Sequence, residues 1–119
     1  MENGVFYMMR EMFDIFQNPP AEYRMIPLWL WTGKIRRDEV ARQIAEMKQK
    51  GIGGFFISPF SPLDPNYLSS EWFSLVRFTI REANNLGLSI WIYDDIDWPS
   101  GRAAGKVTAV PNAECVLLK

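Results

Sequence analysis

Three aspartates stand close together in the last third of this 119-residue chain, within the stretch LSIWIYDDIDWPSG that runs from Leu88 to Gly101. Paired carboxylates perform most glycosidic bond hydrolysis, because one protonates the leaving oxygen while the other attacks the sugar or activates a water molecule. Aspartates that follow a strand also accept hydrogen bonds from backbone N–H groups, so a structural role stays open. The candidate carboxylates are Asp94, Asp95 and Asp97, of which only Asp95 is a candidate for catalysis.

Aromatic side chains near the ends of the expected strands indicate how a ligand would be held. Flat aromatic rings bind the apolar faces of sugars and of similar rigid ligands. We therefore expect Trp31 and Trp98 to line a pocket. The remaining tryptophans are assigned to packing, and they are Trp29, Trp72 and Trp91.

The elements that must position these residues alternate between strands and helices. Short apolar runs predict three strands, over residues 25–31, 53–58 and 88–94. Apolar residues at helical spacing predict one helix over 38–50 and a second that begins at Ser69 or Ser70 and ends at Gly87. Because right-handed crossovers make such strands parallel, their carboxyl ends meet at the sheet edge where ligands bind.

Residues 1–24 form a lead-in to this α/β unit. Apolar residues between Val5 and Phe16 recur on one helical face, and Asn18-Pro19-Pro20 ends the pattern. We expect a packing helix that flanks the first strand, because basic residues are too sparse for a membrane-surface helix. Residues 25–119 form one partial domain, whose last segment leads from a loop into a third helix.

Composition argues against several classes of function. Thirteen basic and 14 acidic residues, with no basic stripe, argue against nucleic-acid binding. The absence of His and the single Cys exclude the usual zinc sites. The run GRAAGKV is similar to a phosphate-binding loop, but it is one residue short and has Val107 where a hydroxyl is needed. With no membrane-length apolar run and no export signal, we expect a cytoplasmic protein without membrane contacts.

Three strands are too few to close a sheet. A (β/α)8 TIM barrel has eight strand-helix units and typically about 250 residues. The predicted fold is therefore an incomplete α/β unit, a parallel βαβαβ segment like the first three strands of such a barrel. A small doubly wound α/β domain is the alternative. Both leave open sheet edges, which either the rest of a longer protein or self-association with another chain would complete.

Four segments resemble the start of the catalytic barrel of glycoside hydrolase family 106, the α-L-rhamnosidases, and of related TIM-barrel glycosidase-like proteins. They read NPPAEYRMIPLWLW, MKQKGIGGFFI, YLSSEWF and IYDDIDWPSGRAAGKV. The resemblance extends over most of the chain from Asn18 onward, and WPSG with the small residues after it is its most specific part. The chain departs from the pattern at Arg36, where a Ser or Thr helix cap is expected, and at Ala104, where a second glycine is expected.

The resemblance implies a (β/α)8 barrel that hydrolyses glycosidic bonds with inversion, and it leaves open a calcium ion near the sugar in a full-length protein. The catalytic glutamates of that family lie on later strands, so this chain alone is not expected to catalyse. The implied pocket residues are Asp95, Trp98, Ser100 and Arg102. We therefore predict the N-terminal portion of a glycoside hydrolase that acts on a carbohydrate substrate, with α-L-rhamnosides as candidate substrates. A non-catalytic carbohydrate-binding or self-associating fragment is the alternative.

Overall fold

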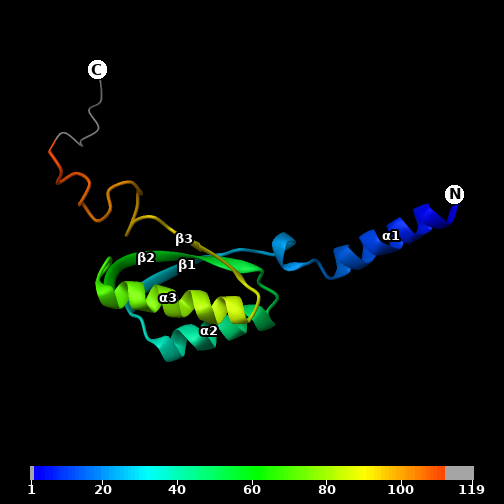
Figure 1. Cartoon of the computed structure of the whole chain (residues 1–119), viewed down its shortest axis with the longest axis horizontal. Coiled ribbons are helices and arrows are strands. Elements are labelled where there is room, and N and C mark those ends of the chain that lie inside the picture. The colour runs from blue at the N-terminus through cyan, green and yellow to red at the C-terminus, as the bar shows by residue number, and fades with distance from the viewer. Residues whose placement is uncertain (1, 112–119) are drawn as a thin grey trace, which may run out of the picture.

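The structure is a computed structural model that describes residues 2–111, and it describes side-chain surroundings from Tyr7 onward (Figure 1). Strands and helices alternate as predicted. The elements are α1 (Glu2–Gln17), the short 3-10 helix η1 (Ala21–Tyr23), β1 (Leu28–Lys34), α2 (Arg37–Gln49), β2 (Gly54–Asp64), α3 (Ser70–Asn85) and β3 (Ser89–Ile92).

The three strands form one parallel sheet in the order β1-β2-β3. Leu28 of β1 is paired with Phe56 of β2, and Gly54 of β2 is paired with Ser89 of β3. Helices α2 and α3 both lie against one face of this sheet (Figure 1). The predicted βαβαβ unit is therefore confirmed, and the opposite face of the sheet is left without a helix among the described elements.

The hydrophobic core lies between the sheet and these two helices. Phe55 and Ile57 of β2 are fully buried and pack in one cluster with Ile44 of α2 and Val76 of α3. Alternation along β2 directs these two strand residues to the helix side, since successive side chains of a strand point to opposite faces. The core thus fixes which face of each strand is covered.

The first and third strands differ at their ends from the predicted ranges 25–31 and 88–94. Pro27 has no N–H to donate, and β1 begins directly after it, at Leu28. β3 ends at Ile92, so the polar loop begins earlier than predicted. The chain therefore leaves the sheet before it reaches the three aspartates.

The second strand is longer than the predicted range 53–58. It continues to Asp64 through Pro59 and Pro62, in a segment that the sequence indicated as a loop. Proline is tolerated where it interrupts no ladder, as on the edge of a sheet. Because β3 pairs only with Gly54–Ile57, no strand pairs with the later part of β2 on that side.

Local sequence signals set the helix ends. The Ser69 hydroxyl accepts a hydrogen bond from the Trp72 N–H at 3.1 Å, which confirms a serine cap for α3. Arg36 stands at the N-cap of α2 without a side-chain cap bond and pairs with Asp38 instead. Residues 101–111 form bends and turns, so the expected third helix does not begin within the described part of the chain.

Helix α1 projects away from the rest of the molecule (Figure 1). The radius of gyration is 20.0 Å, whereas a compact chain of this length has a value of about 13 Å. None of the helices described between residues 2 and 111 is both long and apolar enough to cross a membrane. The molecule is thus an α/β body with an extended lead-in, and α1 does not flank the first strand as expected.

Candidate functional site

The candidate site is the loop that follows β3. It lies beside a cleft of about 300 Å3, whose lining includes Asp97, Trp98 and Arg102. The loop leaves the sheet at the carboxyl end of β3, and the carboxyl ends of parallel strands are where α/β proteins bind ligands. The position therefore agrees with the sequence-based expectation for this stretch.

Asp95 is the structural centre of the loop. Its Oδ1 accepts hydrogen bonds from the N–H groups of Ile96 and Ala104, both at 2.8 Å. Its Oδ2 accepts from the N–H groups of Arg102 at 2.6 Å and Ala103 at 2.7 Å. The residue is 1% exposed. The structure therefore places this carboxylate inside the loop, where both of its oxygens accept backbone hydrogen bonds, although the residue also lines the cleft.

The protonation of Asp95 follows from these bonds. Burial raises the pKa of the carboxyl group, but the four backbone N–H donors lower it by more, so the pKa lies below its usual value. The four donors therefore favour the ionised form of this carboxyl group. The bonds give Asp95 a role in holding the loop.

Two consecutive alanines make this arrangement of donors possible. Ala103 has φ 47° and Ala104 has φ 55°, both in the left-handed region. Successive residues with such dihedrals can turn their N–H groups toward one anion, and here the anion is the Asp95 carboxylate. The glycine expected at position 104 would adopt this conformation without strain, whereas alanine adopts it at a cost of roughly 1 kcal/mol.

The same bonds explain why GRAAGKV is no phosphate-binding loop. The N–H groups of Arg102, Ala103 and Ala104 are the donors that a bound phosphate would need, and all three already donate to Asp95. The geometry thus gives the nucleotide-binding alternative no support.

Asp97 joins the loop to β2. Its carboxylate accepts hydrogen bonds from the N–H and the hydroxyl of Ser61, each at 2.7 Å. The Asp97 N–H donates to the carbonyl of Pro59 at 3.2 Å. Both oxygens of this carboxylate are therefore engaged within the protein.

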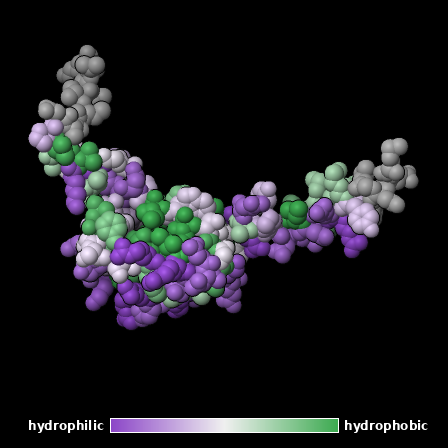
Figure 2. Space-filling view, in the orientation of Figure 1, coloured by the Kyte–Doolittle hydropathy of each residue, from purple (hydrophilic) through white to green (hydrophobic). Residues whose placement is uncertain are grey.

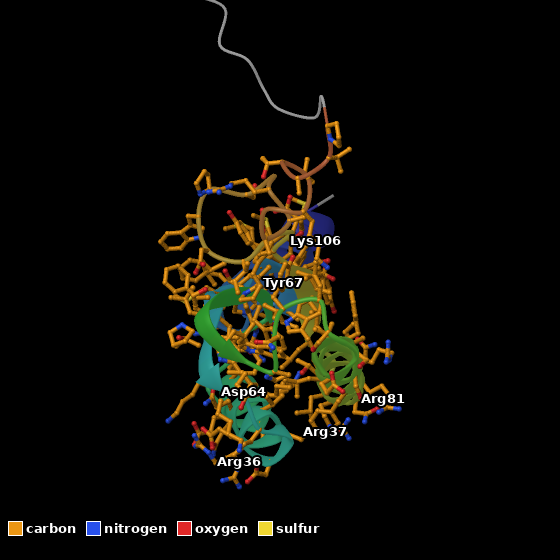
Figure 3. The ribbon with its side chains drawn as sticks, turned by 90° about the vertical axis from the view of Figure 1, so that its left-hand side faces the viewer. Arg36, Arg37, Asp64, Tyr67, Arg81 and Lys106 are labelled. Carbon is orange, nitrogen blue, oxygen red and sulfur yellow. The ribbon has the colours of Figure 1, made fainter. Side chains whose placement is uncertain are left out.

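Asp94 differs from the other two aspartates because its side chain is exposed. Within residues 2–111, no hydrogen bond engages its carboxylate, while its backbone carbonyl accepts one from the Tyr67 hydroxyl at 3.1 Å. Burial raises the pKa of Tyr67, and Asp95 and Asp94 raise it further, so the phenol stays a neutral donor. Figure 3 shows Tyr67 at the base of the loop that leads to Lys106. Asp94 is thus the carboxylate of the three that is available to a ligand.

The tryptophans separate into exposed and buried groups. The Trp98 ring is 58% exposed and meets Phe60 edge-on, with the ring centroids 5.4 Å apart. Trp31 is 1% exposed and belongs to the core on the helix side of the sheet, so the structure removes it from the predicted pocket. Trp91 was assigned to packing, yet it is 40% exposed and stacks on Phe56 on the sheet face away from the helices.

The other tryptophans pack as expected, Trp72 in the core and Trp29 against it. Ser100 and Arg102 are exposed on the same loop. Four of the predicted pocket residues line the cleft beside it, and they are Asp95, Asp97, Trp98 and Arg102; Asp94 and Ser100 do not line it.

Three residues of the site were missed from the sequence, and they are Phe60, Ser61 and Tyr67. All three lie in or just after the second half of β2, which its prolines marked as a loop. A sequence signal for Phe60 did exist. If the alternation of side chains along the strand is continued through the prolines, Phe60 falls on the same side as Phe56, away from the helices.

Calcium is the one metal that the sequence left open. Among the described residues, no group of three or more carboxylate, His or Cys side chains is placed to hold a metal ion. Asp95 and Asp97 already use their oxygens on N–H and hydroxyl donors. The residues at this loop therefore do not fit a calcium site of their own.

The comparisons with known proteins point to carbohydrate-active enzymes. No family model matches the chain. The chain is 28% identical over 95 residues to a Formosa agariphila protein named "Putative beta-glucuronidase", a match that covers 71% of this chain and 8% of that protein. It also matches the structure of a rhamnosidase from Novosphingobium sp. PP1Y at a TM-score of 0.64 and 29% identity, over 72% of this chain and 9% of that one.

These matches support a relationship to glycoside hydrolases, without assigning the chain to one family among them. They also agree with the observed fold, because a parallel βαβαβ segment aligns with part of the rhamnosidase. The chain spans less than a tenth of the length of either protein.

Proposed function

We propose that this chain forms part of a (β/α)8 glycoside hydrolase and that the loop of residues 93–105 is one wall of its sugar pocket. The parallel βαβαβ unit and the relationship to glycoside hydrolases support the proposal. The loop follows the carboxyl end of a strand, the position of the active site in barrels of this kind.

One observation supports this role above the others. The exposed Trp98 ring is braced by Phe60 and stands on a loop that Asp95 and Asp97 fasten from two sides. A rigid, exposed aromatic ring binds the C–H face of a sugar with little loss of conformational entropy. Asp94, whose carboxylate is free within the described chain, would accept hydrogen bonds from sugar hydroxyls.

In this proposal the loop binds sugar and does not transfer protons. The carboxylate of Asp95 already accepts hydrogen bonds within the loop, and that of Asp97 accepts them from Ser61 of β2. The general acid and base of glycosidic hydrolysis would therefore be carboxyl groups elsewhere in the barrel, as the resemblance to rhamnosidases implies.

We propose an α-L-rhamnoside as the sugar. Rhamnose has a methyl group where glucuronate has a carboxylate, and an apolar ring pair such as Trp98 and Phe60 complements a methyl group. Arg102 offers an exposed guanidinium that would instead favour a uronate. The two sugars can therefore be separated by experiment.

The test is a chemical-shift titration of the isotope-labelled chain with methyl α-L-rhamnoside and with methyl β-D-glucuronide. We expect saturable shifts in residues 93–105 with the rhamnoside, at a Kd of about 1 mM or weaker. Trp98→Ala should abolish them, while Trp91→Ala, which removes another partly exposed tryptophan on the sheet, should not. If only the glucuronide caused shifts, and Arg102→Gln abolished them, the proposed sugar would be a uronate and not a rhamnoside. No loop shift with either sugar would refute the pocket.

A further inference from the structure

Two alanines with the same left-handed backbone stand side by side in the loop, and they differ in what lies around them. Ala103 and Ala104 both have a positive φ, and both donate their N–H to the Asp95 carboxylate. Ala104 lines the cleft of about 300 Å3, whereas Ala103 does not. Ala104 is also the more exposed of the two. The loop therefore contains a matched pair, with one alanine on the cleft wall and one away from it.

The methyl group of Ala104 is not needed to hold the loop. The bond to Asp95 is made by the backbone N–H of Ala104, at 2.8 Å, and glycine has the same N–H. Glycine would also adopt this conformation without the strain that a Cβ atom causes. Residues with a strained backbone gather at ligand sites, where the strain serves a function. Since the methyl group does not serve the loop, its place on the cleft wall indicates a role toward a ligand.

The cleft wall around this methyl group is largely apolar. Its apolar side chains are those of Ile96, Trp98, Pro99 and Ala104. The carboxylates of Asp95 and Asp97 also line the cleft, but they already accept hydrogen bonds within the protein. Burying a hydroxyl group without a hydrogen-bond partner is costly, whereas C–H groups pack well on aromatic and aliphatic side chains. A sugar in this cleft would therefore turn an apolar part toward the wall.

The cleft stands at the end of the hydrophobic face of the sheet. Figure 2 shows hydrophobic residues gathered over the strands, in contrast to the hydrophilic helices. Phe60, which meets the Trp98 ring, falls on the same side of β2 as Phe56, away from the helices. In the proposed barrel that face is the packed interior, so the loop and its cleft lie at the mouth of the barrel. A ligand at the mouth would meet the wall formed by residues 95–105.

We propose that Ala104 is a specificity-determining residue of the sugar pocket, whose methyl group packs against the methyl group of rhamnose and occupies the space that a hydroxymethyl group would need. The inference rests on the proposed sugar binding and deepens it, because it names the part of the sugar that the cleft selects. Rhamnose is mannose with a methyl group in place of the hydroxymethyl group. An α-L-mannoside therefore differs from the α-L-rhamnoside by a single hydroxyl, and it is the matched ligand for the test.

Chemical-shift titrations of the labelled chain with methyl α-L-rhamnoside and methyl α-L-mannoside test the proposal. We expect the wild-type chain to bind the rhamnoside at least about 10-fold more tightly. In Ala104→Gly the Kd of the rhamnoside should rise about 4-fold, because one buried methyl contact is lost, while that of the mannoside should stay unchanged. The preference for the rhamnoside should therefore fall below about 3-fold.

Loop stability gives a second readout that moves in the opposite direction. Glycine at position 104 relieves the left-handed strain, so amide exchange in the loop of Ala104→Gly should become slower while sugar affinity falls. A residue that served only to hold the loop would move stability and affinity together. Slower exchange with weaker rhamnoside binding is therefore the result that we expect for a residue in contact with the sugar.

Ala103→Gly is the matched control, because it relieves the same strain and keeps the N–H that donates to Asp95. It should slow amide exchange and leave the Kd of both sugars unchanged. The specificity role would be overturned, with the pocket intact, by equal binding of the two sugars to the wild-type chain. Rhamnoside binding that is unaltered in Ala104→Gly, or equally weakened in Ala103→Gly, would overturn it too. No loop shift with either sugar in the wild-type chain would instead refute the pocket, and the inference with it.

Discussion

Replacing Asp95 by asparagine tests how the loop is held. The side chain keeps its size, but one of its two acceptor oxygens becomes an NH2 group. In the better orientation the remaining oxygen still accepts from Ile96 and Ala104. The new NH2 group then faces the N–H groups of Arg102 and Ala103, which lie only 2.6 and 2.7 Å from the present oxygen.

The expected effect follows from two lost bonds. Hydrogen bonds to a charged, buried group contribute about 1.5–3 kcal/mol each. Losing two should therefore lower the free energy of opening the loop by at least about 3 kcal/mol, or roughly a 100-fold change in equilibrium. Because Asp95 lies after β3 and outside the hydrophobic core, the loop should open while the sheet and helices remain folded.

Residue-resolved hydrogen exchange measures this effect directly. In Asp95→Asn the N–H groups of Arg102, Ala103 and Ala104 should exchange about 100-fold faster, while those of α3 should keep their protection. Asp94→Asn is the matched control, since it makes the same chemical change at an exposed neighbour and should leave exchange unaltered. Unchanged protection of these three N–H groups in Asp95→Asn would refute the reasoning.

Three further predictions concern the same loop and the helix cap. Folding lowers the pKa of Asp95, so its ionised form stabilises the loop at every pH above the unfolded-state pKa of about 4. This stabilisation is lost only as the pH falls through the lower pKa of the folded state. The free energy of opening the loop, measured by amide exchange, should therefore be constant from pH 7 to about 4. Ala104→Gly should stabilise the loop by about 0.5 kcal/mol by relieving a left-handed alanine, seen as slower exchange, whereas faster exchange would contradict this. Ser69→Ala should cost about 1 kcal/mol in urea unfolding by removing the α3 cap, and Ser70→Ala, at the next position, should cost clearly less.

The fold was predictable to the extent that local signals determine it. Helical spacing, the serine cap at Ser69 and the glycines after two helices act over a few residues, and they placed α2 and α3 correctly. The second half of β2 was missed, because Pro59 and Pro62 exclude a central strand but not one that has a strand neighbour on one side only. Whether a second strand pairs there depends on the length of β3, which is not local information.

The sequence predicted where the candidate site lies, but it did not predict which role each of its residues has. Three aspartates after a strand looked alike in sequence, yet one is buried, one bonds to Ser61 and one is exposed. The difference arises from the left-handed backbone at Ala103 and Ala104, which turns N–H groups back toward Asp95. Trp31 was predicted in the pocket but lies in the core, because the helices cover the face of β1 on which it stands, and the sequence does not show which face they cover.

The central claim is that Trp98 presents its ring to a sugar, and intermolecular nuclear Overhauser effects test it most directly. With methyl α-L-rhamnoside bound, we predict contacts from the methyl and ring C–H protons of the sugar to the indole of Trp98 and to the ring of Phe60. Contacts to Trp91 instead, or no contact to any aromatic ring of the loop, would contradict the account.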